Sequence, residues 1–184
     1  MKRVYIFLAD GFEEVEALTC IDLLRRAGIE VKSISINENE KVIGRSNICI
    51  LSDEVYNSEK DYNDADAIIL PGGYPGYVNL YNHKGVANII SSYNKEKKII
   101  AAICAAPTIL GQMNVLKDRV AVCYPGMEKD LKCKEISVQD TIVDGHIITS
   151  RGIGSCIDFC LEIIDLILGE ESKIFVSKDI VYKI

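Results

Sequence analysis

The residue best suited to chemistry is Cys104, which follows a short apolar run at residues 98–102 and precedes a segment of helical character. A tight turn from a buried strand into a helix lifts one side chain above the sheet and tolerates only small neighbours. Four small residues flank this position: Ala101, Ala102, Ala105 and Ala106. The N–H groups and dipole of the following helix favour a thiolate, so we expect an easily ionised nucleophile. The alternative is a buried, inert cysteine, because free cysteines are among the most buried residues.

Glu16 is the candidate proton carrier. It lies with Glu13 and Glu14 in the first turns of a helix expected over residues 13–27, where acidic residues are common for electrostatic reasons alone. Glu16 falls near the apolar side of this helix, so we expect partial burial. A carboxyl group whose pKa is raised by desolvation can donate a hydrogen bond to a thiolate. This arrangement would stabilise a reactive sulfur without a histidine.

The glycine pair in Pro71-Gly72-Gly73 follows another buried apolar run, at residues 67–70. Glycines there allow close backbone approach, and the N–H groups of Gly73 and Ala105 could form an oxyanion hole. A plain tight turn is the alternative. No G-x-G-x-x-G sequence opens the first helix, which argues against a dinucleotide site.

Several further residues have both a functional and an ordinary explanation. Arg26 and Arg45 could hold a substrate carboxylate, or could be surface charges. The segment around Arg151 (150–154) could bind an anion, or could be an ordinary glycine-rich loop. Cys156 and Cys160 lie one helical turn apart, and core packing explains them better than chemistry does. Neither histidine is visibly near Cys104, so the sequence supports no Cys–His dyad.

Alternating strand and helix patterns predict an α/β protein with a mostly parallel sheet and helices on both faces. In such sheets ligands bind beyond the carboxyl ends of the strands, where the candidate residues would meet. Strands are expected at residues 4–8, 30–36, 48–51, 67–70, 98–102, 120–123, 136–138, 141–143 and 147–150. Helices are expected at residues 13–27, 84–94, 105–113 and 155–168, and the tail at residues 173–184 is expected to dock as an edge element.

Composition places the chain among ordinary globular proteins. Its 184 residues, 48% hydrophobic and 26% charged, predict one domain over residues 1–184. The net charge of −6 argues against a nucleic-acid partner, and the longest apolar runs are too short for a membrane span or signal peptide. We therefore expect a cytoplasmic protein whose seven cysteines are mostly reduced thiols. With two histidines and no Cys-x-x-Cys, neither a structural zinc site nor another metal is expected.

Five motifs together resemble the ThiJ/PfpI superfamily, in the branch of the Parkinson-disease-associated protein and its bacterial deglycase relatives. Each stands in the family's order and spacing across nearly the whole chain. The motifs are Ala-Asp-Gly-Phe-Glu-Glu-Val-Glu (9–16), Asp-Leu-Leu-Arg-Arg-Ala-Gly (22–28), Leu-Pro-Gly-Gly (70–73), Ala-Ala-Ile-Cys-Ala-Ala-Pro (101–107) and Thr-Ser-Arg-Gly-Ile-Gly (149–154).

The resemblance implies a flavodoxin-like three-layer sandwich that forms a homodimer and needs no cofactor. It implies that Cys104 is the oxidisable nucleophile, that Glu16 is the protonated glutamate beside it, and that Gly73 and Ala105 are backbone donors. Gly72, Tyr124 and Arg45 complete the predicted substrate-binding set. Activities attributed to relatives are glutathione-independent glyoxalase, deglycation of methylglyoxal adducts, and redox-sensing or chaperone roles.

Two departures from the family bear on these activities. Peptidase-like branches carry a histidine directly after the cysteine, where this chain has Ala105, so a cysteine peptidase is the weakest alternative. Tyr124 stands where a related branch has a histidine, which puts efficient acid–base turnover in question unless Glu16 moves the proton itself. The leading hypothesis is therefore an enzyme acting on a small 2-oxoaldehyde or a glycated protein. Its alternative is a redox sensor whose Cys104 is oxidised to a sulfinic acid.

Overall fold

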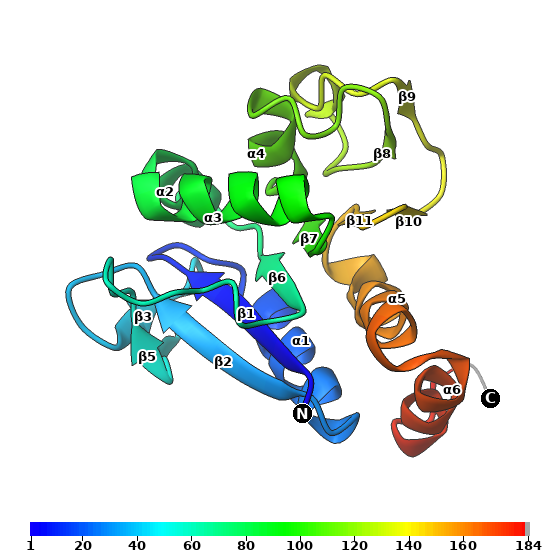
Figure 1. The fold of residues 1–184 in the computed structure, drawn as a ribbon, viewed down its shortest axis with the longest axis horizontal. Coiled ribbons are helices and arrows are strands. Elements are labelled where there is room, and N and C mark those ends of the chain that lie inside the picture. Colours follow the sequence, from blue (N-terminus) through cyan, green and yellow to red (C-terminus); the bar gives the residue numbers. More distant parts are fainter. Residues whose placement is uncertain (183–184) are drawn as a thin grey trace.

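A seven-stranded sheet forms the centre of the computed structural model, which describes residues 1–182 (Figure 1). The strand order is β10-β11-β7-β6-β1-β2-β5, and every neighbouring pair is parallel except β10 with β11. The strands are β1 (Arg3–Leu8), β2 (Glu30–Ser35), β5 (Glu54–Val55), β6 (Ala67–Leu70), β7 (Ile99–Ile103), β10 (Thr141–Asp144) and β11 (Ile147–Ser150). The predicted α/β architecture is thereby confirmed.

Helices cover both faces of this sheet (Figure 1). One face packs against α1 (Glu14–Arg26), α5 (Cys156–Leu168) and α6 (Glu170–Asp179), and the other against α2 (Gly76–Asn82), α3 (Lys84–Glu96) and α4 (Pro107–Gln112). The apolar run of β1 explains the two cores. Tyr5 and Phe7 contribute to one core and Ile6 and Leu8 to the other, because alternate residues of a strand face opposite sides.

Two small sheets lie outside the central one. The strands β3 (Lys41–Ile43) and β4 (Cys49–Leu51) form an antiparallel pair, whereas β8 (Val120–Ala121) and β9 (Glu135–Ile136) are parallel. The strand predicted at residues 120–123 is thus shorter than expected. The N–H of Val122 donates to Thr149 Oγ1 at 3.1 Å, so this backbone pairs with a side chain instead of extending the ladder.

The edge element predicted for residues 173–184 is wrong over the described residues, because the chain forms α6 there. Gly169 (φ +90°) ends α5, and Glu170 and Glu171 then occupy the first turn of the new helix, where negative charge is favourable. Val176 is the one buried residue between Glu170 and Asp179, so this helix lacks the repeated apolar positions from which a sequence predicts a helix. Residues 183–184 lie outside the described residues.

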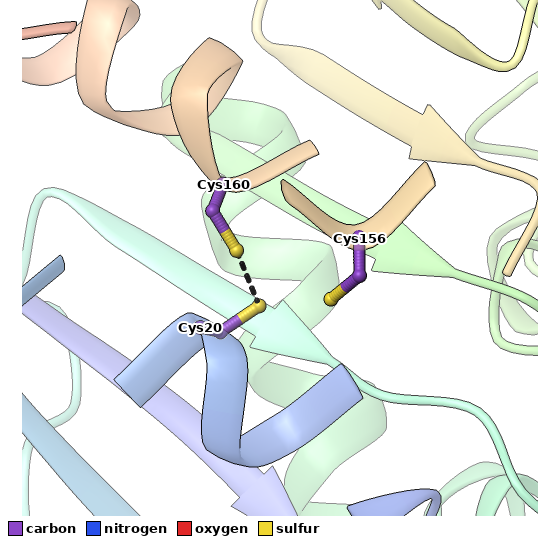
Figure 2. A group of neighbouring side chains, drawn as sticks. All are labelled: Cys20, Cys156 and Cys160. Carbon is purple, nitrogen blue, oxygen red and sulfur yellow. Dashed lines mark hydrogen bonds between the residues drawn. The ribbon is translucent and has the colours of Figure 1, made fainter. Parts of the chain in front are cut away.

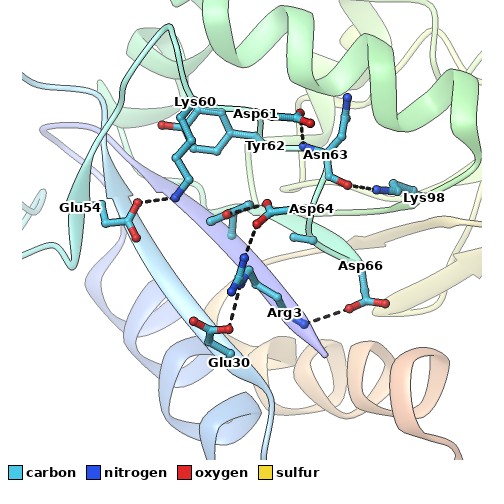
Figure 3. Close-up of polar contacts among 12 residues, drawn as sticks. Arg3, Glu30, Glu54, Lys60, Asp61, Tyr62, Asn63, Asp64, Asp66 and Lys98 are labelled. Atoms are coloured by element: carbon cyan, nitrogen blue, oxygen red, sulfur yellow. Dashed lines mark hydrogen bonds and ion pairs between the residues drawn. The ribbon is translucent and has the colours of Figure 1, made fainter. Parts of the chain in front are cut away.

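Ion pairs connect the start of β1 to neighbouring segments, and a further pair lies at β5 (Figure 3). Arg3 donates to Glu30 at 2.9 Å and also pairs with Asp64, while Lys60 pairs with Glu54. Such partly exposed pairs contribute about 0–1 kcal/mol each, so they add to packing without replacing it. No helix within residues 1–182 is long and apolar enough to cross a membrane.

Candidate active site

Cys104 lies on a strained turn immediately after β7. Its φ of +64° is in the left-handed region, which residues with a side chain rarely adopt. The surrounding backbone holds this conformation, because the N–H of Cys104 donates to Ser150 O at 2.9 Å and its carbonyl accepts from Tyr124 N at 2.7 Å. The turn predicted from the small neighbouring residues is present, although α4 begins only at Pro107 and is shorter than expected.

The strand order brings the three predicted loops together, because β7, β6 and β1 are neighbours whose carboxyl ends share one edge. Glu16, fully buried in the first turns of α1, accepts a hydrogen bond from Gly72 N at 2.8 Å through Oε2. Its carboxyl group also shares a hydrogen bond with the sulfur of Cys104. Within residues 1–182 the other carboxyl oxygen, Oε1, is buried without a partner.

Tyr124 closes the same small space. A β-carbon placed on Gly152 would lie 3.7 Å from Tyr124 Cδ2, 3.8 Å from Glu16 Oε1 and 3.9 Å from Cys104 Sγ. The unpartnered oxygen, the sulfur and the tyrosine ring therefore surround one point. A small reacting group placed there would touch all three.

The pKa of Glu16 agrees with the sequence-based expectation, whereas the pKa of Cys104 differs from it. Burial raises the pKa of Glu16 to about 8, so the carboxyl group is mostly protonated at neutral pH. Burial, followed by the neighbouring charge of Glu16, raises the pKa of Cys104 to about 12. The prediction of an independently acidified thiol is thus wrong, because sequence reasoning counted the favourable N–H groups but not the desolvation of the sulfur.

The two groups nevertheless act as a coupled pair. Part of the rise in the pKa of Cys104 comes from negative charge on Glu16, so a proton on the carboxyl group removes that part. Loss of one proton from the pair leaves a single negative charge that either group can carry. The form with the charge on sulfur is the nucleophilic one.

The sequence predicts that the N–H groups of Gly73 and Ala105 point at a substrate oxygen. In the structure both donate to the Cys104 sulfur and lower its pKa. The N–H of Gly72 instead holds Glu16, so it is not directed at a substrate oxygen. Both glycines are sterically required. A β-carbon at Gly72 would lie 2.6 Å from Cys104 Cβ, and one at Gly73 would lie 2.4 Å from Glu13 N.

Two arginines reach the cleft above Cys104, whose volume is about 470 Å³. Arg45 pairs with Glu13 at 3.1 Å, and Arg151 pairs with Asp140 at 3.0 Å. Sequence reasoning left open which arginine reaches the site, and it treated Glu13 only as a helix-start residue. Glu13 is 5% exposed and its carboxylate faces Arg45, whereas the carboxylate of Glu14 accepts a hydrogen bond from Ser46 N. The spacing of these two residues in the sequence does not show which of them reaches the cleft.

The two histidines do not join this site. His83 caps α3, where its Nδ1 accepts from Val86 N at 3.2 Å. His146 contacts Arg119 and Asn94. Neither histidine lines the cleft, whereas Glu13, Glu16 and Tyr124 all do.

Sequence comparison identifies relatives over the whole described fold. Residues 2–166 match the DJ-1/PfpI family. Protein DJ-1alpha of Drosophila melanogaster is 35% identical over 179 residues, which cover 96% of this chain and 82% of that protein. The Parkinson disease protein 7 homolog of Danio rerio is 31% identical, with 99% and 98% covered. Protein DJ-1 homolog B of Arabidopsis thaliana is 34% identical, but the chain spans only 42% of its length.

Solved structures agree with this result. Toxoplasma gondii DJ-1 in an oxidised form superposes with a TM-score of 0.95 at 29% identity, and both chains are covered completely. Drosophila melanogaster DJ-1beta gives a TM-score of 0.92 at 32% identity, covering 100% of this chain and 99% of that one. These neighbours confirm the predicted flavodoxin-like fold.

Proposed function

Because the chain belongs to the DJ-1/PfpI family, we propose that it is a cysteine-dependent glyoxalase or deglycase that acts on methylglyoxal or its early adducts. The observation that carries this proposal is the contact between Cys104, on its strained turn, and the buried carboxyl group of Glu16. A nucleophile and a proton carrier thus share a hydrogen bond at the floor of one cleft.

The first step is addition of the Cys104 sulfur to the aldehyde carbon of methylglyoxal. The S–H proton passes to the carboxylate of Glu16 as the sulfur attacks, and Glu16 then protonates the aldehyde oxygen to give a hemithioacetal. The raised pKa of Glu16, about 8, suits a group that must both accept and donate a proton near neutral pH. N–H groups of Gly73 and Ala105 lie beside the sulfur, where they can stabilise the developing alkoxide.

The second step moves hydrogen within the substrate. Glu16 removes the proton from the former aldehyde carbon and returns a proton to the adjacent carbon. The hydroxyl group of the hemithioacetal gives its proton to the ketone oxygen and becomes the thioester carbonyl. The product is a lactoyl thioester of Cys104, and water hydrolyses it to lactate and the free thiol. Methylglyoxal and water are thereby converted to lactate without an external oxidant. Arg45 and Arg151 supply positive charge at the cleft to hold the carboxylate product.

The test is conversion of methylglyoxal to lactate by the purified protein, followed by NMR. We expect turnover by the wild type and by Cys49→Ser, because Cys49 is exposed and outside the cleft. We expect none by Cys104→Ser. Turnover should rise with pH through about 8, as the pair loses its first proton. Equal rates for the wild type and Cys104→Ser would exclude this function.

A second function, redox sensing, is favoured by the same sulfur and by the oxidised form of the Toxoplasma gondii relative. Peroxide would oxidise the Cys104 thiolate to a sulfenic acid with release of hydroxide, and a second peroxide would oxidise the sulfenic acid to the sulfinic acid with release of water. Mass spectrometry should then find two added oxygens on Cys104 before any other cysteine. Oxidation of all cysteines at equal rates would contradict this role.

A cysteine peptidase is the least supported function, because Ala105 follows Cys104 and neither histidine lines the cleft. We also propose that the chain forms a homodimer and lies in the cytoplasm. The homodimer is checked by light scattering of the purified protein, and the cytoplasmic location by fractionation of cells that express it.

A further inference from the structure

Three cysteine sulfurs meet between α1 and α5, outside the cleft of Cys104 (Figure 2). Cys20 comes from the middle of α1, and Cys156 and Cys160 come from the first two turns of α5. The three sulfurs lie within 4.8 Å of one another, and the Cys160 thiol donates to Cys20 Sγ at 3.3 Å. All three side chains are buried, with exposed fractions of 0–2%.

The helices hold these sulfurs in place before any ligand binds. Cys156 and Cys160 are four residues apart, so they lie on the same face of α5. That face packs against α1, which presents Cys20 from the opposite side (Figure 2). A trigonal metal with metal–sulfur bonds of about 2.3 Å separates its sulfurs by roughly 4.0 Å. Only small movements of the three cysteine side chains are therefore needed to bring their sulfurs to this separation.

The donor set narrows the choice of metal. Within the described residues, no histidine or carboxylate oxygen belongs to the group formed by these three sulfurs. Zn²⁺ in a structural site takes four ligands, whereas soft thiolates without hard donors select Cu(I). We propose that Cys20, Cys156 and Cys160 form a trigonal thiolate site for Cu(I). Because the ligands are thiolates, binding would release thiol protons to solvent.

A surface cleft gives a cation access to this site. The cleft has a volume of about 490 Å³, and Cys156 forms part of its wall, with Cys20 and Cys160 deeper. Asp22 and Asp179 also line it, and both pair with Arg26, at 3.0 and 2.9 Å. Cu(I) would therefore meet the Cys156 sulfur first and draw the other two into coordination.

The experiment titrates reduced, metal-free protein with Cu(I) in the absence of oxygen, against a chelator that changes colour when it gives up the metal. We expect the wild type to remove one Cu(I) per chain. Cys104→Ser and Cys49→Ser should remove the same amount, because neither sulfur belongs to the cluster. Cys160→Ala should bind at least about 100-fold more weakly, because it lacks a direct ligand. An excess of Zn²⁺ should not displace the copper.

A second measurement keeps the proposal testable if Cys160→Ala does not fold, which circular dichroism would reveal. X-ray absorption of copper-loaded Cys104→Ser should show three sulfur neighbours around copper at about 2.3 Å. Three results would each overturn the site: unchanged binding by folded Cys160→Ala, loss of binding in Cys104→Ser, or failure of the wild type to compete with the chelator. Nitrogen or oxygen neighbours in place of sulfur would do the same.

Discussion

The Cys104 site and the three-cysteine cluster use the same element for different purposes. Helix α1 supplies Glu16 to the first and Cys20, one turn later on the same side, to the second. Cys104 stands alone on a strained turn, partly exposed to a cleft and beside a group that accepts its proton. The cluster instead gathers three buried sulfurs on regular helices. Attack on a substrate needs one accessible sulfur with a proton partner, whereas metal binding needs several sulfurs that converge.

The two sites are adjacent and use different sulfurs. The Cys156 thiol donates to the main-chain oxygen of Glu16 at 3.6 Å, and the charge of Cys156 also raises the pKa of the Glu16 carboxyl group. Replacement of Cys104 should leave the three cluster sulfurs in place, because Cys104 is not one of them.

The largest expected effect comes from Cys104→Ser. We expect kcat/KM for methylglyoxal to fall by at least about 10³-fold, because a serine hydroxyl beside a protonated carboxyl group is a much weaker nucleophile. Copper binding by the cluster should not change. Measurement of both quantities on one preparation gives the comparison its clearest test, and a parallel loss of copper binding would show that the sites are not separate.

Glu16→Gln should reveal the raised pKa as a dependence of stability on pH. The pKa of this carboxyl group rises from 4.5 to about 8 on folding, so between these values only the unfolded chain loses the proton. Folding stability of the wild type therefore falls as pH rises through this window, by about 1.4 kcal/mol per unit for this group.

Glutamine has no proton to lose and removes this contribution. Relative to the wild type, Glu16→Gln should be more stable at pH 8 than at pH 5 by roughly 3–5 kcal/mol. Urea unfolding at both pH values measures the difference. An equal effect of the substitution at both values would show that Glu16 is not the protonated partner of Cys104.

Much of the architecture follows from local patterns in the sequence. The apolar runs at β1, β6 and β7 and the small residues around Cys104 predict both the sheet edge and the strained turn. The cluster could not be predicted in this way. Cys156 and Cys160 are recognisable as helical neighbours, but their approach to Cys20 depends on the packing of α1 against α5 across about 140 residues.

The protonation state of the Cys104 thiol could not be predicted from the sequence either. The helix and N–H groups that favour a thiolate are visible in the order of residues, whereas desolvation depends on what the fold places above the sulfur. The paired arginine and glutamate at the cleft, Arg45 and Glu13, are likewise brought together only by the tertiary structure.

Gly72→Ala should have an intermediate effect that is confined to the Cys104 site. The added β-carbon would lie 2.6 Å from Cys104 Cβ and 2.9 Å from Glu16 Oε2, so the pair must separate. Overpacking of this kind costs about 1–3 kcal/mol of stability, and we also expect reduced turnover. Gly154→Ala is the matched control, because no atom lies within 4 Å of its added β-carbon. Equal urea midpoints for the two variants would contradict the close approach.

The smallest effect is expected from Tyr124→Phe, which asks whether the Cys104 site contains one proton carrier or two. The contact of Tyr124 with Cys104 O is made by its backbone N–H, and its side chain is 52% exposed, so removal of the hydroxyl should change stability by less than about 0.5 kcal/mol. If Glu16 alone moves the proton, kcat/KM should fall by less than about tenfold. A loss of 10²–10⁴-fold, typical of a general acid or base, would instead make the phenol a second carrier in the place where related proteins have a histidine.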